Sequence, residues 1–293
     1  MPAPLLNRRR LLQGGLFGLG LSLSLGGMLP QRLAGAPPQQ PELRFLAVAD
    51  TGTGGTGQYA VARAMEAYRQ RNPFKLVVLA GDLIYNDGEI NKVAAVFEQP
   101  YAPLLKAGVV FRSVLGNHDI RSNNGLDHLV YPAFNFGNGQ RWYSFRQGPA
   151  QFFMLDTNVN TDWNRQLGWL EQQLKTSQAP WKVVVGHHPV YSSGIYGTDQ
   201  GMIARLTPLF RRYGVQLYIN GHEHNYERTR AIDGTTYLCV GAGAGVRPVG
   251  TTAITAKSAS TLSFAALEIF PEEIRIQGIS SEGQVFDEGV IRR

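Results

Sequence analysis

The fold is decided by a stretch that runs Leu76-Val77-Val78-Leu79-Ala80-Gly81-Asp82-Leu83-Ile84-Tyr85. A short apolar run that stops at a glycine is typical of a β-strand. The aspartate and the tyrosine would then lie just beyond the carboxyl end of that strand. Ligand sites of α/β sheets gather at this edge, so the stretch predicts both a strand and a polar site at its end.

Four other apolar runs end in the same way, and most have a glycine that lets the backbone turn closely. In chain order they are Leu43–Ala49 before Asp50-Thr51-Gly52, Val109–Leu115 before Gly116-Asn117-His118-Asp119, Val183–Val185 before Gly186-His187-His188, and Val215–Ile219 before Asn220-Gly221-His222-Glu223-His224. Five of the six histidines lie at these ends, an arrangement that scattered core histidines would not give. Oxygen ligands mixed with imidazole suit iron, manganese or zinc.

Helical patterns separate several of these runs, and another strand is expected at Gln151–Leu155. Apolar residues recur at helical spacing in Gln58–Arg71, Arg165–Lys175 and Met202–Tyr213. The C-terminal segments alternate instead and predict an antiparallel meander; they are Thr261–Phe270, Glu273–Ile279 and Gln284–Ile291. We therefore expect α/β units followed by β ribbons in one domain over residues 37–293.

The composition limits the kinds of site and partner. Hydrophobic residues make up 43% of the 293 residues, which excludes a disordered protein. The single cysteine, Cys239, excludes an internal disulfide and a thiolate metal cluster. The formal net charge is +6, but residues 1–36 carry four arginines and no acid, which leaves 24 basic and 22 acidic residues elsewhere. A basic surface for nucleic acid is therefore not expected.

Residues 1–36 have the composition of an export signal. Arg8-Arg9-Arg10 precedes an apolar run to Leu29, and Ala34-Gly35-Ala36 offers a small-x-small cleavage site. The segment resembles a twin-arginine signal, which implies the twin-arginine export machinery as a partner and a periplasmic or secreted protein. Pro37 disfavours cleavage after Ala36, so the cleavage point stays open. A general secretory signal and a retained membrane anchor are the alternatives.

In their order, the five motifs resemble those of the calcineurin-like metallophosphoesterases and, within them, the small purple acid phosphatases. The matching residues are Asp50-x-Gly52, Gly81-Asp82-x-x-Tyr85, Gly116-Asn117-His118, Gly186-His187 and Gly221-His222-x-His224. Each motif alone is weak, but five in order, each after a strand, are specific. The resemblance covers nearly the whole chain from about residue 43. It implies an α/β fold, a four-layer α/β/β/α sandwich with a dinuclear metal site at the carboxyl ends of the strands.

The resemblance also assigns the metal ligands. The side chains that would hold a ferric ion are Asp50, Tyr85 and His224. Those that would hold a divalent iron, zinc or manganese ion are Asn117, His187 and His222, and Asp82 would bridge the two ions. A phenolate is a hard, charged donor that favours iron(III), and a neutral asparagine leaves the second metal more electrophilic. Asp119 and Glu223 are expected to support these ligands.

The implied reaction is hydrolysis of a small phosphate monoester by attack of a metal-bound hydroxide. A phosphodiesterase or nucleotide phosphatase with the same site is the nearest alternative, and a catalytically silent binding protein is an alternative of another class. Gly52-x-Gly54-x-x-Gly57 also matches a dinucleotide fingerprint, but Asp50 would repel a pyrophosphate. We expect these glycines to form a flexible rim and Gly241–Gly245 to approach the site closely. No arginine or lysine cluster near the motifs identifies the leaving group.

His118 is expected to act on the phosphate and to protonate the leaving group. Small members of the family use a second histidine nine positions after the ligand that corresponds to His187, and Tyr196 stands there. A phenol, with a pKa of about 10, is a weaker acid than imidazolium. His118 should therefore carry most of the acid role, with Tyr196 or His188 only assisting.

The double substitution Arg8→Lys with Arg9→Lys tests the export route. It keeps the positive charge but removes the paired guanidinium groups, so export should stop if the twin-arginine machinery is used. The amount of protein in the periplasm or medium, against that in the cytoplasm, is the measurement. Normal export of the variant would indicate the general secretory route.

Overall fold

The computed structural model describes residues 39–293, so the predicted signal at residues 1–36 lies outside the described part. The strands are β1 (Leu43–Val48), β2 (Leu76–Leu79), β3 (Val110–Ser113), β4 (Tyr143–Gln147), β5 (Ala150–Met154), β6 (Trp181–Val185), β7 (Leu217–Asn220), β8 (Tyr226–Thr229), β9 (Thr236–Val240), β10 (Thr255–Ala259), β11 (Ser263–Ile269), β12 (Glu273–Ser280) and β13 (Val285–Arg292). The α-helices are α1 (Thr56–Arg71), α2 (Ala102–Lys106), α3 (Leu126–Val130), α4 (Trp163–Thr176) and α5 (Gln200–Tyr213). Short 3-10 turns are η1 (Ile90–Lys92), η3 (Asp119–Arg121), η4 (Asn123–Gly125) and η5 (Pro132–Phe134), and η2 (Ala94–Glu98) is a π-helix.

Two mixed sheets contain all of these strands. One has the order β13-β12-β11-β1-β2-β3, and the other has the order β10-β8-β9-β7-β6-β5-β4. Strands β1, β2 and β3 are parallel, as are β5, β6, β7 and β9. The carboxyl ends of parallel strands share one edge of a sheet, so the predicted polar ends gather at one edge of each sheet.

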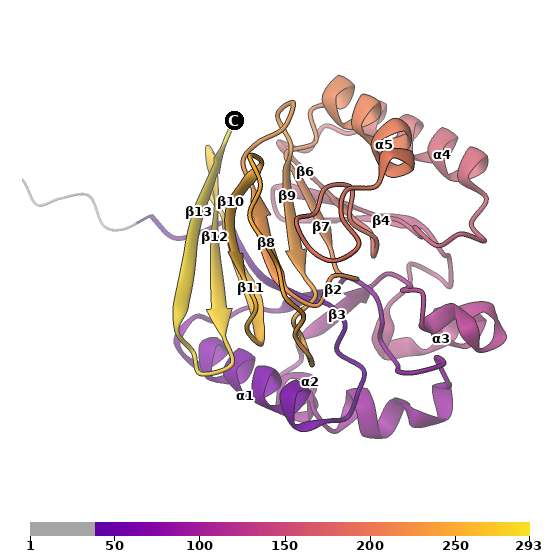
Figure 1. Cartoon of the computed structure of the whole chain (residues 1–293), viewed down its shortest axis with the longest axis vertical. Coiled ribbons are helices and arrows are strands. Elements are labelled where there is room, and N and C mark those ends of the chain that lie inside the picture. Colours follow the sequence, from indigo (N-terminus) through magenta and orange to yellow (C-terminus); the bar gives the residue numbers. More distant parts are fainter. Residues whose placement is uncertain (1–38) are drawn as a thin grey trace, which may run out of the picture. The chain divides into compact units, whose positions relative to one another are not determined.

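The sheets pack face to face and helices cover their outer faces (Figure 1). Phe45 of β1 meets Phe152 of β5 edge to face, with ring centroids 5.2 Å apart. Tyr68 of α1 contacts Phe264 of β11, and the α4 and α5 side chains form a second core with Phe153 and its neighbours on the other sheet. Helices therefore flank two sheets, which confirms the predicted four-layer α/β/β/α fold.

The predicted strands and helices are all present, with bounds shifted by at most two residues. Gly214 caps the carboxyl end of helix α5, just after Tyr213. Its φ of 64° is the left-handed conformation that glycine adopts easily at this position. The three C-terminal strands form the predicted antiparallel meander, and β11 adds it to the edge of β1. Strands β4, β8, β9 and β10 were not predicted from the sequence. Strand β10, TAKSA, has no large apolar residue, so its strand conformation depends on pairing with β8.

Candidate metal centre

The side chains predicted to bind ferric iron converge on the phenol of Tyr85. Its Oη lies 3.0 Å from Asp50 Oδ1, 2.9 Å from Asp82 Oδ2 and 3.1 Å from His224 Nε2. Asp50, Asp82 and His224 each place a ligand atom within 4.8 Å of the others. Four side chains from the ends of β1, β2 and β7 thus meet around one small volume.

The three residues predicted to bind the divalent ion meet around the amide of Asn117. Asn117 Oδ1 lies 3.1 Å from His187 Nε2 and 2.9 Å from His222 Nδ1. Asp82 Oδ1 lies 3.5 Å from His187 Nε2, while its other oxygen faces Tyr85. The seven predicted ligands therefore form two adjacent groups, and Asp82 presents one oxygen to each.

His188 lies closer to this second group than the sequence indicated. Its ligand atom falls within 4.8 Å of those of His187 and His222, and its ring is 4.6 Å from that of His222. The Thr157 hydroxyl lies 2.9 Å from His188 Nδ1, which orients the ring. His188 is thus a neighbour of the centre as well as a structural side chain.

The backbone is turned into an uncommon conformation where three of the predicted ligands lie. Asp50, Asp82 and His222 have φ values of 56°, 52° and 69°, in the left-handed region that side chains rarely adopt. Gly81 has a φ of 91°, and a Cβ there would lie 2.5 Å from His187 Nδ1. Strain of this kind is found at functional sites, where the surrounding structure enforces it.

Buried hydrogen bonds hold the strand ends in register. Asp119, which is fully buried, accepts hydrogen bonds from the amides of Leu83, Ile84 and Gly116, at 2.9, 3.1 and 2.8 Å. The His187 Nδ1 donates to the carbonyl of Ala80 at 2.9 Å, which leaves its Nε2 directed at Asn117. Asp119 therefore supports the ligands, as expected, by joining the loops after β2 and β3.

The electrostatics of the cluster suit a bound cation. Burial raises the pKa of Tyr85 far above its usual value, and the carboxylates of Asp50 and Asp82 raise it further. Burial, with His187 nearby, lowers the pKa of His222 to about 3, and the same causes lower that of His188 well below its usual value. Neutral imidazoles are the form that binds metal. The two carboxylates that share one phenol are like charges that a cation would compensate, so the donor set fits a pair of metal ions.

A family model described as calcineurin-like phosphoesterase matches residues 43–226, which include strands β1 to β7 and all five motifs. The chain belongs to this family. Its members are metallophosphoesterases, and the two adjacent ligand groups are consistent with a dinuclear metal site in this one.

Curated relatives of this phosphoesterase include purple acid phosphatases. Purple acid phosphatase 7 of Arabidopsis thaliana is 29% identical over 232 residues, which cover 69% of this chain and 70% of the relative. Tartrate-resistant acid phosphatase type 5 of Mus musculus is 26% identical over 250 residues, which cover 73% of this chain and 76% of the relative.

Two solved structures share the fold. A purple acid phosphatase from seeds of yellow lupin (Lupinus luteus) has a TM-score of 0.73 at 21% identity, over 88% of this chain and 55% of that one. The Plasmodium protein GAP50, described as an anchor in the inner membrane complex, has a TM-score of 0.74 at 24% identity, over 85% and 88%. A phosphatase and an anchor share this fold, so the fold alone does not determine the function, which depends on the residues of the site.

His118 lies beside the two ligand groups, as its motif predicts. Its backbone amide donates to Asp82 Oδ1 at 3.0 Å, and its Nε2 is 3.9 Å from Asp82 Oδ2. Its ring lies 4.5 Å from that of Tyr85 and retains 19% exposure of the side chain. Tyr196 is more exposed, at 57%, and stacks on the ring of His222 at 4.4 Å.

Two arginines lie at the mouth of the site, although no basic cluster is visible near the motifs in the sequence. Arg121 Nη2 is 3.5 Å from His118 Nε2, and Arg247 Nη1 is 3.2 Å from the hydroxyl of Tyr196. Arg121 follows His118 by three residues and could have been found from that spacing. Arg247 belongs to none of the five motifs, but it comes two residues after the Gly241–Gly245 segment that was predicted to approach the site, and it could have been found from that position.

The expectation that Gly52 and Gly57 form a flexible rim is wrong. A Cβ at Gly52 would lie 1.9 Å from the carbonyl oxygen of Leu83, and one at Gly57 would lie 2.3 Å from that of Ala244. These glycines are packed against backbone with no room for a side chain, so they allow close packing of neighbouring loops and do not form a loose rim. The predicted close approach of Gly241–Gly245 is confirmed, because a Cβ at Gly241 would lie 2.1 Å from the carbonyl oxygen of Glu223.

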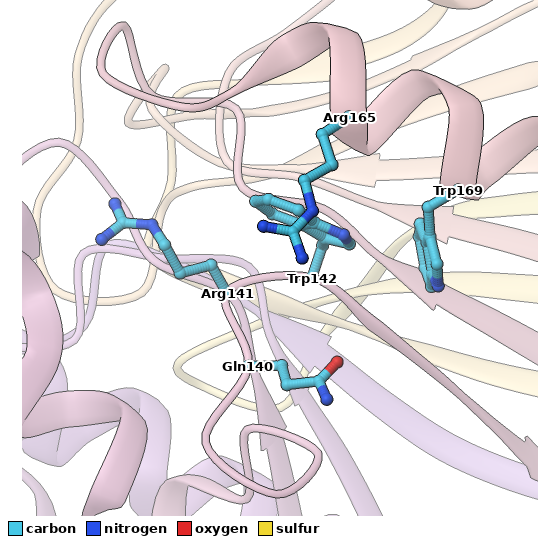
Figure 2. Close-up of a pocket in the computed structure, with 5 residues that line it drawn as sticks. All are labelled: Gln140, Arg141, Trp142, Arg165 and Trp169. Atoms are coloured by element: carbon cyan, nitrogen blue, oxygen red, sulfur yellow. The ribbon is translucent and has the colours of Figure 1, made fainter.

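A separate hollow lies between the start of β4 and α4. Figure 2 shows the residues that line it, which are Gln140, Arg141, Trp142, Arg165 and Trp169. None of them belongs to the two ligand groups. Because none of the lining residues is a predicted ligand, this hollow is not part of the metal centre. Its Arg141 forms an ion pair with Asp156 at 2.6 Å.

No helix among residues 39–293 is both long enough and apolar enough to cross a membrane.

The substitution Asp119→Asn tests how the strand ends are held. One carboxamide oxygen cannot accept all three amides, and its NH₂ group would face a donor, so the free energy of unfolding should fall by about 2–3 kcal/mol. Urea unfolding measures this, and elemental analysis should show reduced metal content. The control Asp233→Asn changes an exposed aspartate whose ion pair with Arg211 is 3.9 Å long, so the expected change is below about 0.5 kcal/mol. Equal stability and metal content in both variants would contradict the assigned role of Asp119.

Proposed function

We propose that this protein is an acid phosphatase of the purple acid phosphatase type, which hydrolyses small phosphate monoesters. The observation that carries the proposal is the position of Asp82 between two ligand groups, one built on Tyr85 and the other on Asn117. Curated relatives named purple or tartrate-resistant acid phosphatases support the same activity.

The proposed ligands of iron(III) are Asp50, Tyr85 and His224, those of a divalent iron, zinc or manganese ion are Asn117, His187 and His222, and Asp82 is the proposed bridge. When bound, such a pair supplies Lewis acidity toward the phosphoryl oxygens and lowers the pKa of water. Tyr85 favours iron(III) as the metal, because a phenolate is a hard, charged donor. A bound cation would lower the phenol pKa, which burial and the two carboxylates otherwise raise. Tyr196 and, in part, His118 are exposed beside the ligand groups, so the substrate would enter on this side, which is the mouth of the site.

His118 is the proposed general acid. Its Nδ1 lies 2.5 Å from the carbonyl oxygen of Asn86, and a carbonyl can only accept, so Nδ1 carries a hydrogen. A second proton on the imidazolium therefore resides on Nε2, the atom that faces the site, and this is the proton available to the leaving oxygen. His188 is less suited to this role, because burial and its histidine neighbours lower its pKa and keep the imidazole neutral, without a second proton to donate. Tyr196 can assist by hydrogen bonding only, because a phenol is a weak acid.

Residues 1–36 complete the proposal. The paired arginines and the apolar run that follows support export by the twin-arginine machinery to the periplasm or medium. That route carries folded proteins, and a preassembled metal centre requires a folded domain because its ligands come from distant strand ends. The substrate would then be a small phosphate ester outside the cytoplasm.

Visible colour tests the iron assignment. If the phenol of Tyr85 binds iron(III), the oxidised protein should absorb visible light by charge transfer from phenolate to metal. Tyr85→Phe should remove this band while the far-UV circular dichroism stays unchanged. Elemental analysis of the same samples gives the metals. A colourless wild type that is fully occupied by zinc and fully active would overturn the iron assignment and leave the phosphatase in place.

The substitution His118→Ala tests the general acid. General acid catalysis contributes about 10²–10⁴-fold, so kcat on an alkyl phosphate should fall by about that factor. The loss should be smaller on 4-nitrophenyl phosphate, whose leaving group needs little protonation, and Tyr196→Phe should cost less on both substrates. Equal losses on both esters would mean that His118 only positions the phosphate. Bis(4-nitrophenyl) phosphate is assayed in parallel, and faster turnover of this diester by wild type would contradict a monoesterase.

A further inference from the structure

Arg247 is held at the mouth of the site by three contacts. Its backbone amide donates to the carbonyl of His224 at 2.7 Å, and its Nη1 donates to the hydroxyl of Tyr196 at 3.2 Å. Its guanidinium carbon lies 5.5 Å from the centre of the Tyr196 ring. That ring also stacks on the imidazole of His222, so Tyr196 lies between the guanidinium and a proposed metal ligand.

The two loops that carry this pair are bound to each other. The amide of Gly250 donates to the carbonyl of Ser193 at 3.1 Å, and the hydroxyls of Ser193 and Thr252 are 2.9 Å apart. The amide of Tyr196 also donates to Glu223, a fully buried carboxylate, at 2.6 Å. These bonds fix Tyr196 and Arg247 before a ligand arrives, which lowers the entropic cost of binding.

The charge of Arg247 is uncompensated. Within residues 39–293, no carboxylate lies within 4.0 Å of its guanidinium, whereas Arg121 on the other side of the mouth has Asp87 at 3.5 Å. A half-buried guanidinium without a carboxylate partner is a strong donor toward an anion from outside. Its position beyond Tyr196 leaves it next to the metal centre rather than in it.

Apolar side chains flank this cation. Ile195 and Val246, the chain neighbours of Tyr196 and Arg247, are 63% and 48% exposed, and Tyr196 itself is 57% exposed. Exposed apolar residues at the rim of a site provide contact area for an organic group. The rim thus offers apolar surface and one positive charge together.

Resting on the proposed function, we propose that Tyr196 and Arg247 form a leaving-group subsite. The preferred substrates are then phosphate monoesters of organic alcohols whose leaving group carries a second anionic group, either a carboxylate or a phosphate. Arg247 binds that anion, and Tyr196 orients the guanidinium while its ring contacts the organic part. This subsite selects the substrate and takes no part in the proton transfer assigned to His118.

Three aryl phosphates of similar shape test the subsite. They are 3-carboxyphenyl phosphate, its neutral analogue 3-carbamoylphenyl phosphate, and 3-phosphonophenyl phosphate. Wild type should show a higher kcat/KM on the two anionic esters than on the neutral one. Arg247→Gln should reduce that preference by about five- to tenfold, as expected for one charged hydrogen bond near the surface. The preferred ester of the two anionic ones distinguishes a carboxylate ligand from a phosphate.

Arg146→Gln is the matched control. Arg146 is exposed on β4 and pairs with Gln151 at the start of β5, which is the end of the sheet opposite the metal centre. This variant should keep the wild-type preference. Tyr196→Phe should weaken the preference partly, because it removes the bond to Nη1 but leaves the guanidinium in place.

A binding measurement provides a readout that does not depend on turnover. Phosphonoacetate carries a carboxylate next to a non-hydrolysable phosphonate, and methylphosphonate lacks that carboxylate. Calorimetry on the metal-loaded protein should show tighter binding of phosphonoacetate to wild type, with the difference reduced in Arg247→Gln. Hydrolysis of all three esters with one kcat/KM, unchanged in Arg247→Gln, would overturn the subsite and leave the phosphatase standing. Absence of hydrolysis of any ester by metal-loaded wild type would instead overturn the proposed function.

Discussion

The structure depends on the concentration of negative charge around one phenol. Asp50 and Asp82 both direct an oxygen at Tyr85 Oη, within 3.0 Å, in a region where each carboxylate is only 1% exposed. Like charges at such a distance in a buried site oppose folding unless a cation compensates them. A pair of metal ions removes this conflict, so metal binding and stability of the strand ends should be coupled.

The fold provides the positions that this charge cluster needs. The ligands come from both sheets, and the sheets are joined next to the site where the amide of Ala49, after β1, donates to the carbonyl of Val240 in β9 at 3.0 Å. Asp119 joins the loops after β2 and β3 on one side, and the close packing of Gly241 against Glu223 fixes the other. The left-handed backbone at Asp50, Asp82 and His222 persists because the hydrogen bonds and packing of these neighbours fix the loops in that conformation.

The metal centre and the residues around it are proposed to recognise different parts of the substrate. The proposed metal ligands are buried or half-buried, and the proposed centre binds the phosphoryl group. Tyr196, at 57% exposure, and the half-buried His118 and Arg247 are the side chains proposed to meet the leaving group. Substitution of rim residues therefore offers a way to alter the preferred ester, since Arg247 contacts the centre through Tyr196 and the backbone of His224.

The motifs and their order determined the family, the four-layer fold and the seven residues that meet at the centre. They could do so because apolar runs mark buried strands, and because the residue after a strand always lies at the sheet edge. Strand β10 escaped detection because its pairing with β8, and not its own pattern, makes it a strand. The tight packing of Gly52 and the contact of Arg247 with Tyr196 were likewise decided only by tertiary structure. Both depend on which loops pack against each other at the site. Local sequence patterns do not specify contacts between segments that are distant in the chain, such as Gly52 with Leu83 and Arg247 with Tyr196.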